Sequence, residues 1–420
     1  MAKTITEKSR EIPVVAEPDV LVCGGGPGGY VAAVAAARNG ADTLLVERYG
    51  HLGGMATGGH VIFIDMMANN VEQVTLGIAQ EVIERATRYG GVVWRGDRLN
   101  PDIDAEIHKF VAQELVESAP AKIRFHSWVV DTVMEGSTVK GVITESKSGR
   151  QAILAKVVVD ATGDGDIAAF AGAEYEKGTL PITLMCRVGA VDMETAQQWQ
   201  RDNPDTYKRL LDLLHRMKVL VQLPASARIG TGWAPTTREN VVYCHWASFM
   251  DLSATKVEDL TYCEIEGRKR IMAAVDFFNK NVPGWERAYV VDTAPQIGTR
   301  LSRLIKGAYT LTIDDIREET SFVDNIGTCP EYPDHHYEIP YRTLVPTRID
   351  NLLVAGRCIS TDTEAQVRTR IIAPCMTTGQ AAGTAAAIAA KQNIKPRNLI
   401  ESFSPLAEAL LGQNVNLAGL

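Results

Sequence analysis

Short apolar runs and glycine turns alternate in the first fifty residues of the chain. Residues 19–23 (DVLVC) are apolar and are followed by glycines and by an alanine-rich stretch at 30–39, which Gly40 ends in the manner of a helix stop. A second apolar run at 43–46 (TLLV) is closed by Glu47. The order strand, glycine turn, helix and strand is that of a βαβ unit, so we expect the two strands to be parallel.

The pattern then changes to helix and afterwards to strict alternation. Residues 75–118 predict mainly helix, with Asp102 or Asp104 as a cap. Turns at 136–137 and 147–149 separate alternating segments typical of a small antiparallel sheet inserted between parallel strands. The strands predicted from this alternation are 123–125, 128–134, 140–145 and 152–159.

The second half of the chain predicts another domain and a return to the first. Residues 176–290 are richer in Trp, Met and charge, and we interpret them as part of a separate domain. Residues 351–355 (NLLVA) predict a buried strand, and 376–391 a helix of small residues. A chain of 420 residues is also long enough for two or three domains.

Composition and charge exclude some classes of partner. The chain is 45% hydrophobic and 22% charged, which is ordinary for a globular protein. Its net charge of −8 argues against non-specific binding to nucleic acid or anionic lipid. A local arginine cluster can still hold an anionic small substrate.

The cysteines and the apolar runs indicate the cellular compartment in which the protein is expected. The seven cysteines are scattered, odd in number and without C-x-x-C spacing, so we expect neither a disulfide framework nor a zinc knuckle. This favours a reducing compartment, and we expect a cytoplasmic protein. The first residues lack the apolar run of a signal peptide. No stretch reaches the roughly 18 apolar residues of a membrane span.

The glycines after the first predicted strand carry the main functional signal. Residues 24–29 (GGGPGG) contain G-x-G-x-x-G at Gly24, Gly26 and Gly29, with Pro27 and Gly28 between. The first glycine permits a tight turn, the second lets the backbone approach a pyrophosphate, and the third lets helix and strand pack closely. Phosphates then lie at the helix N-terminus, which favours anions.

An acidic residue and three further segments bear on which dinucleotide binds. Glu47 lies at about the 20-residue spacing of the acid that binds a ribose 2′-OH, which disfavours NADP. The alternative interpretation is a glycine-rich turn in an ordinary α/β sheet. FAD is favoured over NAD by the glycine-rich loop at 52–59, by the strand and glycine–acid turn at 157–166, and by the strand at 351–355 leading into Gly356 and Arg357.

The order of these pieces resembles the FAD-dependent oxidoreductases that have a glutathione-reductase-like FAD-binding domain. The resemblance covers nearly the whole chain and includes 297–303 (IGTRLSR), 337–342 (YEIPYR), 355–360 (AGRCIS) and 379–383 (GQAAG). It implies an α/β fold in which a Rossmann-like FAD-binding domain is joined to a mixed α+β substrate or cap domain. The expected boundaries are an arm at 1–14, an FAD-binding domain at 15–175 and 340–415, and a cap at 176–339.

The resemblance also implies residue roles around the cofactor. Gly24, Gly26 and Gly29 would face the pyrophosphate and Glu47 the adenosine ribose. A helix beginning near Thr377 would direct its N–H groups at the flavin, where the reduced ring carries negative charge. The other positions placed near FAD are Arg48, Gly53, Gly54, Met55, Val130, Asp164, Gly356, Arg357 and Thr378.

Candidates for the chemistry come from arginine and histidine. Arg300 suits a carboxylate or a flavin carbonyl, or else an interdomain ion pair. His336 and His60 are candidate general bases, with a solvated loop or a buried strand start as the alternatives. His245 could line the substrate pocket beside a core Trp246. At least one of three further arginines is expected to face the cofactor or substrate: Arg357, Arg368 and Arg370.

What is absent from the sequence narrows the electron route. No histidine spacing predicts a metal site. There is one dinucleotide fingerprint, no redox cysteine pair and no cysteine cluster for iron–sulfur centres. Electrons must therefore enter or leave by another route: oxygen, a quinone, a carrier protein, or a nicotinamide that docks without a dedicated domain.

We expect hydride transfer between a small organic substrate and flavin N5, with substrate oxidation favoured. The alternatives are a flavin reductase or monooxygenase, and a non-catalytic FAD-binding subunit. Homo-oligomerisation is implied by the resemblance alone. Substrate, electron acceptor and direction stay open.

Overall fold

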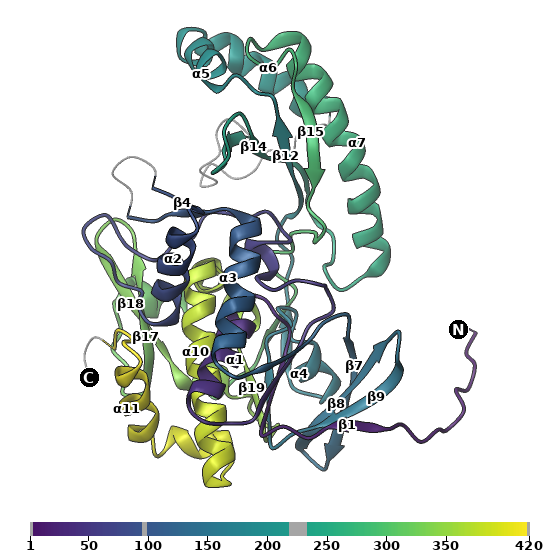
Figure 1. Ribbon diagram of the computed structural model, residues 1–420, viewed down its shortest axis with the longest axis vertical. Coiled ribbons are helices and arrows are strands. Elements are labelled where there is room, and N and C mark those ends of the chain that lie inside the picture. The colour runs from purple at the N-terminus through teal and green to yellow at the C-terminus, as the bar shows by residue number, and fades with distance from the viewer. Residues whose placement is uncertain (1–2, 95–98, 218–232, 418–420) are drawn as a thin grey trace.

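A five-stranded parallel sheet lies at the centre of the larger part of the molecule (Figure 1). The computed structural model describes residues 3–94, 99–217 and 233–417. The strand order is β19-β10-β2-β3-β6, and every neighbouring pair is parallel. The strands are β2 (Val20–Cys23), β3 (Thr43–Val46), β6 (Lys122–Arg124), β10 (Val157–Asp160) and β19 (Leu352–Val354). The predicted βαβ unit is confirmed, because β2 and β3 are parallel and α1 (Pro27–Arg38) connects them.

Helices made largely of small residues cover one face of this sheet. α1 packs along α10 (Ile372–Gln392), beside α3 (Ala105–Ser118) and α2 (Ile78–Arg88). The two helix backbones approach closely, since a Cβ atom on Gly383 would lie 2.0 Å from the Ala32 carbonyl oxygen. The segment 75–118, predicted as mainly helix, contains two helices, α2 and α3. The short strands β4 (Val92–Val93) and β5 (Asp102–Ile103) lie between them.

A four-stranded sheet lies against the parallel sheet on the side away from α1 and α10 (Figure 1). Its order is β1-β9-β8-β7, with β7, β8 and β9 antiparallel and β1 parallel to β9. The strands are β1 (Val14–Ala16), β7 (Trp128–Glu135), β8 (Thr138–Ser146) and β9 (Gly149–Leu154). The predicted strand at 152–159 is wrong as a single element: it divides into the end of β9 and the start of β10, which belong to different sheets.

The middle of the chain forms a separate body above the parallel sheet in the view of Figure 1. Its antiparallel sheet has the order β13-β14-β12-β15, and the long helix α7 (Val257–Asn281) packs on it. Trp246, Phe278 and Trp285 centre its core, with ring centroids 4.8 to 5.7 Å apart. The remaining elements are β12 (Ile182–Gly189), β13 (Trp233–Pro235), β14 (Val242–Phe249), β15 (Tyr289–Thr293), α5 (Met193–Asp202) and α6 (Pro204–Arg216).

The change of hydrophobic core does not coincide with the predicted boundary at residues 339 and 340. Apolar residues from Ile182 to Ala294 belong to the core of the middle body, whereas Ile305 and Ile339 already pack with the parallel sheet. The hairpin of β17 (Asn325–Glu331) and β18 (His335–Pro340) contacts α10 and α8 and so lies with the first body. The physical reason is that this hairpin buries its apolar face against α10.

The helix of small residues predicted near the C-terminus begins earlier than expected. α10 begins at Ile372 and not near Thr377. Pro374 falls within its first turn, where a missing N–H costs no helical hydrogen bond. Within the described residues, no helix is both long and apolar enough to span a membrane.

Short elements complete the fold. The remaining strands and α-helices are β11 (Tyr175–Lys177), β16 (Arg303–Ile305), α4 (Asp166–Phe170), α8 (Ile313–Arg317), α9 (Thr363–Thr369) and α11 (Ser404–Gly412). The 3-10 turns are η1 (Gly54–Ala56), η2 (Tyr341–Leu344), η3 (Gly356–Cys358) and η4 (Pro396–Ile400).

Candidate active site

The glycine turn between β2 and α1 differs in crowding from one glycine to the next. Gly24 has a φ of +100°, and a Cβ atom there would lie 2.4 Å from the Ala161 carbonyl oxygen. A Cβ atom on Gly29 would lie 1.7 Å from the Gly24 carbonyl oxygen. At Gly26, by contrast, a Cβ atom would meet nothing within 4 Å. The turn is therefore closed on its protein side and open at Gly26, the N-cap of α1.

Glu47 ends β3 beside this turn. Its carboxylate accepts hydrogen bonds from the Gly25 N–H at 2.6 Å and from the Tyr49 N–H at 2.8 Å. The next residue, Arg48, lies over the rings of Tyr49 and Trp128, with 4.9 and 5.6 Å from its guanidinium carbon to the ring centroids. A fixed acid and a stacked cation thus stand at the carboxyl end of the strand, where α/β sheets bind their ligands.

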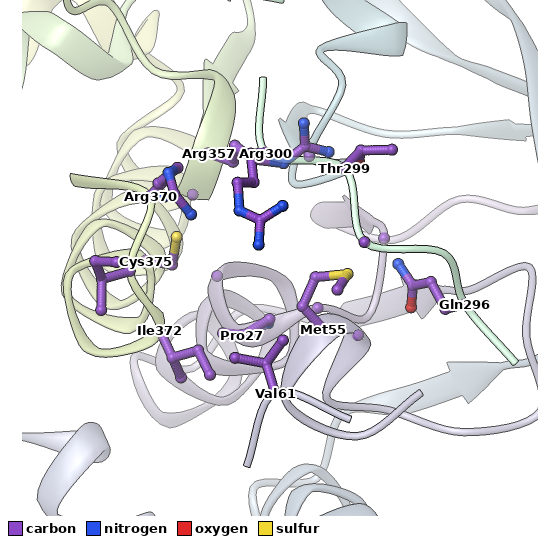
Figure 2. Close-up of a pocket in the computed structure, with 18 of the residues that line it drawn as sticks. Pro27, Met55, Val61, Gln296, Thr299, Arg300, Arg357, Arg370, Ile372 and Cys375 are labelled. Atoms are coloured by element: carbon purple, nitrogen blue, oxygen red, sulfur yellow. The ribbon is translucent and has the colours of Figure 1, made fainter. Parts of the chain in front are cut away.

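A cavity of about 710 Å³ runs from this turn into the space between the two bodies. The larger body contributes the glycine turn, the end of β3, the start of β7 and the approach to α10, and the middle body contributes residues of β12, β14 and the segment before β16. Figure 2 shows Arg300, Arg357 and Arg370 together on one side of the cavity, across from Pro27, Met55 and Val61.

The cavity gathers many of the positions predicted from the sequence. Those on its wall are Gly24, Gly26, Pro27, Gly28, Glu47, Arg48, Gly54, Met55, Arg300, Gly356 and Arg357. All three arginines near α10, namely Arg357, Arg368 and Arg370, also line it. Chain segments separated by more than 300 residues therefore form one surface.

Six other predicted cofactor positions lie behind that surface or beside it. Gly29 packs against the turn, and the Gly53 N–H donates to the Gly25 carbonyl oxygen at 2.8 Å. On β7 the wall is formed by Trp128 and Val129 and not by Val130. The other positions off the wall are Asp164, Thr377 and Thr378.

Thr378 does not line the cavity but holds Gly356, which does, through a hydrogen bond. Its Oγ1 accepts a hydrogen bond from the Gly356 N–H at 3.0 Å and donates to the Cys375 carbonyl oxygen at 2.9 Å. Thr377 and Thr378 lie in the second turn of α10, because the helix begins at Ile372. Cys375 is the thiol on the wall, and burial raises its pKa to about 12, so it stays protonated.

Asp164 neutralises one of the cavity arginines. Its Oδ1 accepts hydrogen bonds from Arg357 Nη2 at 2.8 Å and from Ser302 Oγ at 2.6 Å. Burial raises the pKa of Asp164, but Arg357 and Ser302 outweigh it and hold the pKa below its ordinary value. Arg357 is thereby oriented by a side chain of the β10–α4 turn.

The middle body presents Arg300 and His245 to the cavity. Arg300 Nη1 donates to the Pro181 carbonyl oxygen and to Thr183 Oγ1, each at 2.6 Å. His245 lies on β14, and its Nε2 atom is buried without a hydrogen-bond partner among the described residues. Burial, and then the charge of Arg300, lower the pKa of His245 to about 3. The imidazole is therefore neutral at physiological pH.

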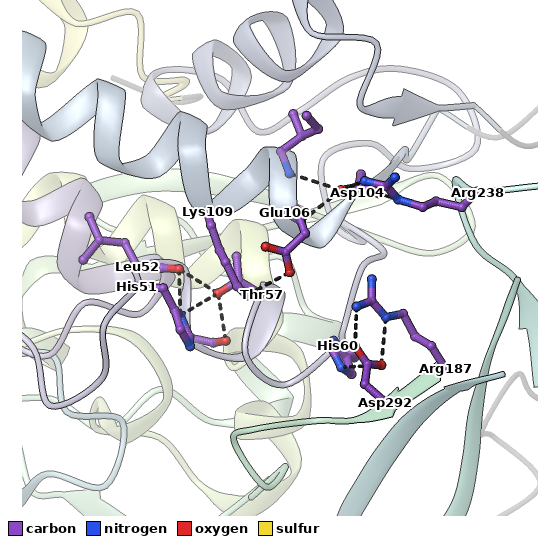
Figure 3. A network of polar contacts seen from close by, with 12 residues as sticks. His51, Leu52, Thr57, His60, Asp104, Glu106, Lys109, Arg187, Arg238 and Asp292 are labelled. Atoms are coloured by element: carbon purple, nitrogen blue, oxygen red, sulfur yellow. Dashed lines mark hydrogen bonds and ion pairs between the residues drawn. The ribbon is translucent and has the colours of Figure 1, made fainter. Parts of the chain in front are cut away.

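The two histidines predicted from the sequence as candidate general bases, His60 and His336, lie outside the cavity wall. His60 is buried at the junction of the two bodies, with a φ of +57° and its Nε2 3.3 Å from Asp292 Oδ1 (Figure 3). Arg187 donates from Nε to the same Oδ1 atom at 3.0 Å. His336 lies opposite Pro330 on the β17–β18 hairpin. Neither histidine is on the cavity wall.

Metals and disulfides have no visible place in the described chain. No group of three or more His, Cys, Asp or Glu side chains is arranged to hold a metal ion in residues 3–94, 99–217 and 233–417. All seven cysteines are buried and unpaired.

Comparisons with known proteins show the family to which the chain belongs and the fold that it shares. Residues 19–410 match the family described as FAD dependent oxidoreductase. Human mitochondrial dihydrolipoyl dehydrogenase is 27% identical over 205 residues, which are 45% of this chain and 39% of that enzyme. This chain thus matches well under half of the length of that relative.

Two solved structures share the fold over most of the chain. A geranylgeranyl bacteriochlorophyll reductase-like protein from Thermoplasma acidophilum is 16% identical, with a TM-score of 0.50, over 95% of this chain and 82% of that one. The flavin-dependent brominase Bmp2 is 12% identical, also with a TM-score of 0.50, over 95% of this chain and 84% of that one. At such identities the likeness concerns fold.

Proposed function

This chain belongs to the family of FAD-dependent oxidoreductases, and from that premise we propose that it transfers a hydride between a small organic substrate and FAD, with substrate oxidation as the forward direction. One observation carries the proposal. One cavity is lined by the glycine turn between β2 and α1, by the start of α10, and by Arg300 and His245 of the middle body. The residues expected to bind the cofactor and those expected to bind the substrate therefore line the same cavity.

The residues on the wall fit FAD. The open side of Gly26 leaves room for a pyrophosphate against the backbone, and no side chain caps α1 there. Glu47 presents a fixed carboxylate for ribose hydroxyls. The cavity volume of about 710 Å³ falls within the roughly 300–1,000 Å³ of ligand pockets.

Each end of the cavity would have its own task. The N-terminus of α1 would hold the phosphates, and the N-terminus of α10 would face the ring system. Bound FAD supplies the two-electron acceptor or donor that no side chain of the protein can provide. Arg357, oriented by Asp164, would lie beside the cofactor as a hydrogen-bond donor.

His245 replaces the earlier candidates as proton acceptor. When a carbon of the substrate loses a hydride, its hydroxyl or amine must lose a proton. His245 is a neutral imidazole on the wall, and its Nε2 atom has no hydrogen-bond partner among the described residues. Arg300, held by Pro181 and Thr183, would orient the substrate.

The test is an anaerobic absorbance titration of the purified protein with carboxylates, alcohols and amines. Flavin bands near about 370 and 450 nm that survive dialysis indicate tight FAD binding, as the phosphate-binding turn leads us to expect. Loss of these bands with one class of compound identifies the substrate class and supports oxidation. Loss of the bands with NAD(P)H alone would favour a reductase or monooxygenase. If none of the donors removes the bands, a non-catalytic subunit would be favoured.

Substitution of His245 tests the proton acceptor. His245→Gln should slow flavin reduction by the identified substrate about 100-fold or more, because general base catalysis contributes that much. FAD content and reduction by dithionite should not change. His336→Gln is the matched control, since His336 lies off the cavity, and it should reduce at the wild-type rate. Equal rates for both variants would remove His245 from the mechanism.

A further inference from the structure

The charged side chains on the cavity wall differ in whether the protein neutralises them. Asp166 pairs with Arg303 at 2.9 Å, Arg357 with Asp164 at 2.8 Å, and Arg368 with Glu331 at 3.0 Å. Arg48 instead stacks on two aromatic rings.

Arg300 and Arg370 stand apart from this set. Neither pairs with a carboxylate among the described residues. Within the described residues, Arg300 donates only to neutral oxygens, those of Pro181 and Thr183. Arg370 is half-buried, and its buried Nε atom has no hydrogen-bond partner in the part of the chain that the structure describes. A partly buried charge without an opposite charge is costly, so two such arginines beside a cavity favour an anion from outside the chain.

The charges of these arginines persist at neutral pH. Burial, and then the charges of Arg300 and Arg357, lower the pKa of Arg370 to about 10. Arg370 therefore remains a cation while it is repelled by two neighbours. An anion placed among them relieves the repulsion as well as the unpaired charge.

We infer that Arg300 and Arg370 together form the binding site for the carboxylate of an organic-acid substrate. The inference rests on the proposed function and supplies the substrate class. Arg300 comes from the middle body, and Arg370 immediately precedes α10, so the carboxylate would join the two bodies. The planar guanidinium fork matches a carboxylate with two parallel hydrogen bonds.

The opposite wall favours an organic acid over an inorganic anion. Met55 and Val61 lie across the cavity from the arginines (Figure 2). A ligand with an anionic head and a carbon skeleton would satisfy both sides, whereas sulfate or phosphate would leave the apolar side without a partner.

The same anion would prepare His245 for its task. The charge of Arg300 is one of the two causes that lower the pKa of His245. A carboxylate against Arg300 offsets that charge and moves the pKa of His245 upward, toward the value at which it accepts a proton at neutral pH. The substrate would thus help to activate its own base.

The experiment is a binding titration of the FAD-loaded protein, followed by the shift of the flavin absorbance at constant ionic strength. The probes are benzoate and succinate, with benzamide and succinamide as uncharged counterparts and sulfate as inorganic anion. We expect at least one carboxylate to bind about tenfold or more tightly than its amide and than sulfate. Binding needs no turnover, so failure of the proposed oxidation would leave this result intact.

Variants assign the effect to the two arginines. Arg300→Gln and Arg370→Gln should each weaken carboxylate binding about tenfold to a hundredfold and leave amide binding unchanged. Arg368→Gln is the matched control, because Arg368 lines the same cavity but is paired, and it should change binding by less than about threefold. Arg370→Gln should be at least as stable as the wild type, since among the described residues Arg370 has no partner to lose. Arg300→Gln also removes two hydrogen bonds, so its stability is measured beside its binding.

Three results would overturn the inference. One is equal binding of carboxylate, amide and sulfate. Another is wild-type carboxylate affinity in both arginine variants. The third is loss of FAD from Arg300→Gln or Arg370→Gln with unchanged carboxylate affinity in the remaining holoprotein, which would assign the arginines to the cofactor.

Discussion

At the scale of single residues, neighbouring glycines of one motif carry different constraints. Gly26 has a φ of −67°, which any residue adopts, and open space where a side chain would lie. Gly29 has the Gly24 carbonyl oxygen 1.7 Å from its would-be Cβ. Gly29 is thus required by the packing of the protein, whereas the requirement for Gly26 would come from the ligand proposed above.

This difference predicts opposite phenotypes for two alanine substitutions. Gly26→Ala should change the free energy of unfolding of the apoprotein by no more than about 0.5 kcal/mol, yet weaken FAD binding, because the methyl group occupies the approach to the pyrophosphate. Gly29→Ala should destabilise the apoprotein by about 1–3 kcal/mol through overpacking. Urea unfolding and FAD titration measure both quantities. Destabilisation of the apoprotein by Gly26→Ala would contradict the assignment.

His108 predicts a pH dependence of stability. It is fully buried, its Nε2 lies 3.1 Å from the Tyr30 hydroxyl, and burial lowers its pKa to about 4. In the unfolded chain the pKa is about 6.5. Between these values the unfolded state binds the extra proton, so the free energy of unfolding falls as pH decreases from 6.5 toward 4, by up to about 1.4 kcal/mol per unit.

The matching measurement is urea unfolding of the wild type and of His108→Gln at pH 7.5 and 5. The wild type should lose more stability than the variant, because glutamine does not titrate. Buried Asp160, whose pKa burial raises to about 6, acts with the opposite sign but cancels in the difference between the two proteins. Equal losses would show that His108 is not held neutral.

At the scale of elements, the contact between α1 and α10 sets the geometry of the cavity. Their first turns meet there, since a Cβ atom on Gly28 would lie 3.2 Å from the Cys375 carbonyl oxygen and 3.2 Å from the Gly356 nitrogen. Small residues along α10 allow this approach, so any added bulk would separate the α1 side of the cavity from the α10 side.

Gly383→Ala tests this packing away from the ligand. Its Cβ atom would lie 2.0 Å from the Ala32 carbonyl oxygen, so we expect a loss of about 1–3 kcal/mol or more in the free energy of unfolding. Gly412→Ala on α11 is the control, because nothing lies within 4 Å of that Cβ position. Urea unfolding should find the control within about 0.5 kcal/mol of the wild type. A harmless Gly383→Ala would mean that the helices separate easily.

At the scale of the whole molecule, two polar groups connect the bodies that enclose the cavity (Figure 3). One joins His60 to Asp292 and Arg187. In the other, Asp104 caps α3 by accepting from the Glu106 and Ile107 N–H groups and also accepts from Arg238 Nε at 2.7 Å. Asp104 therefore both caps α3 and forms an ion pair between the two bodies.

Two substitutions separate these roles of Asp104. Asp104→Ala removes cap and ion pair and should cost about 1–2 kcal/mol of unfolding free energy. Arg238→Ala removes only a half-exposed ion pair and should cost less than about 1 kcal/mol. Urea unfolding measures the cost, and limited proteolysis near residue 238 reports opening of the junction. Equal costs would place the whole effect in the ion pair.

The sequence by itself determined what depends on neighbours along the chain. The βαβ unit and the glycine turn with Glu47 at its edge follow from local periodicity and from residues that one backbone shape requires. Family resemblance extended this to FAD. The FAD-dependent oxidoreductase assignment therefore needed no coordinates.

Only the tertiary structure decided which side chains share the cavity and which charges are left unpaired. His245, a residue of β14, lines the wall, whereas His60 and His336 do not. The start of α10 and the division of 152–159 between two sheets also depended on packing. The physical reason is that burial, pKa and pairing belong to a residue's surroundings in space. For Arg300 and Arg370 those surroundings come from segments far apart in the chain.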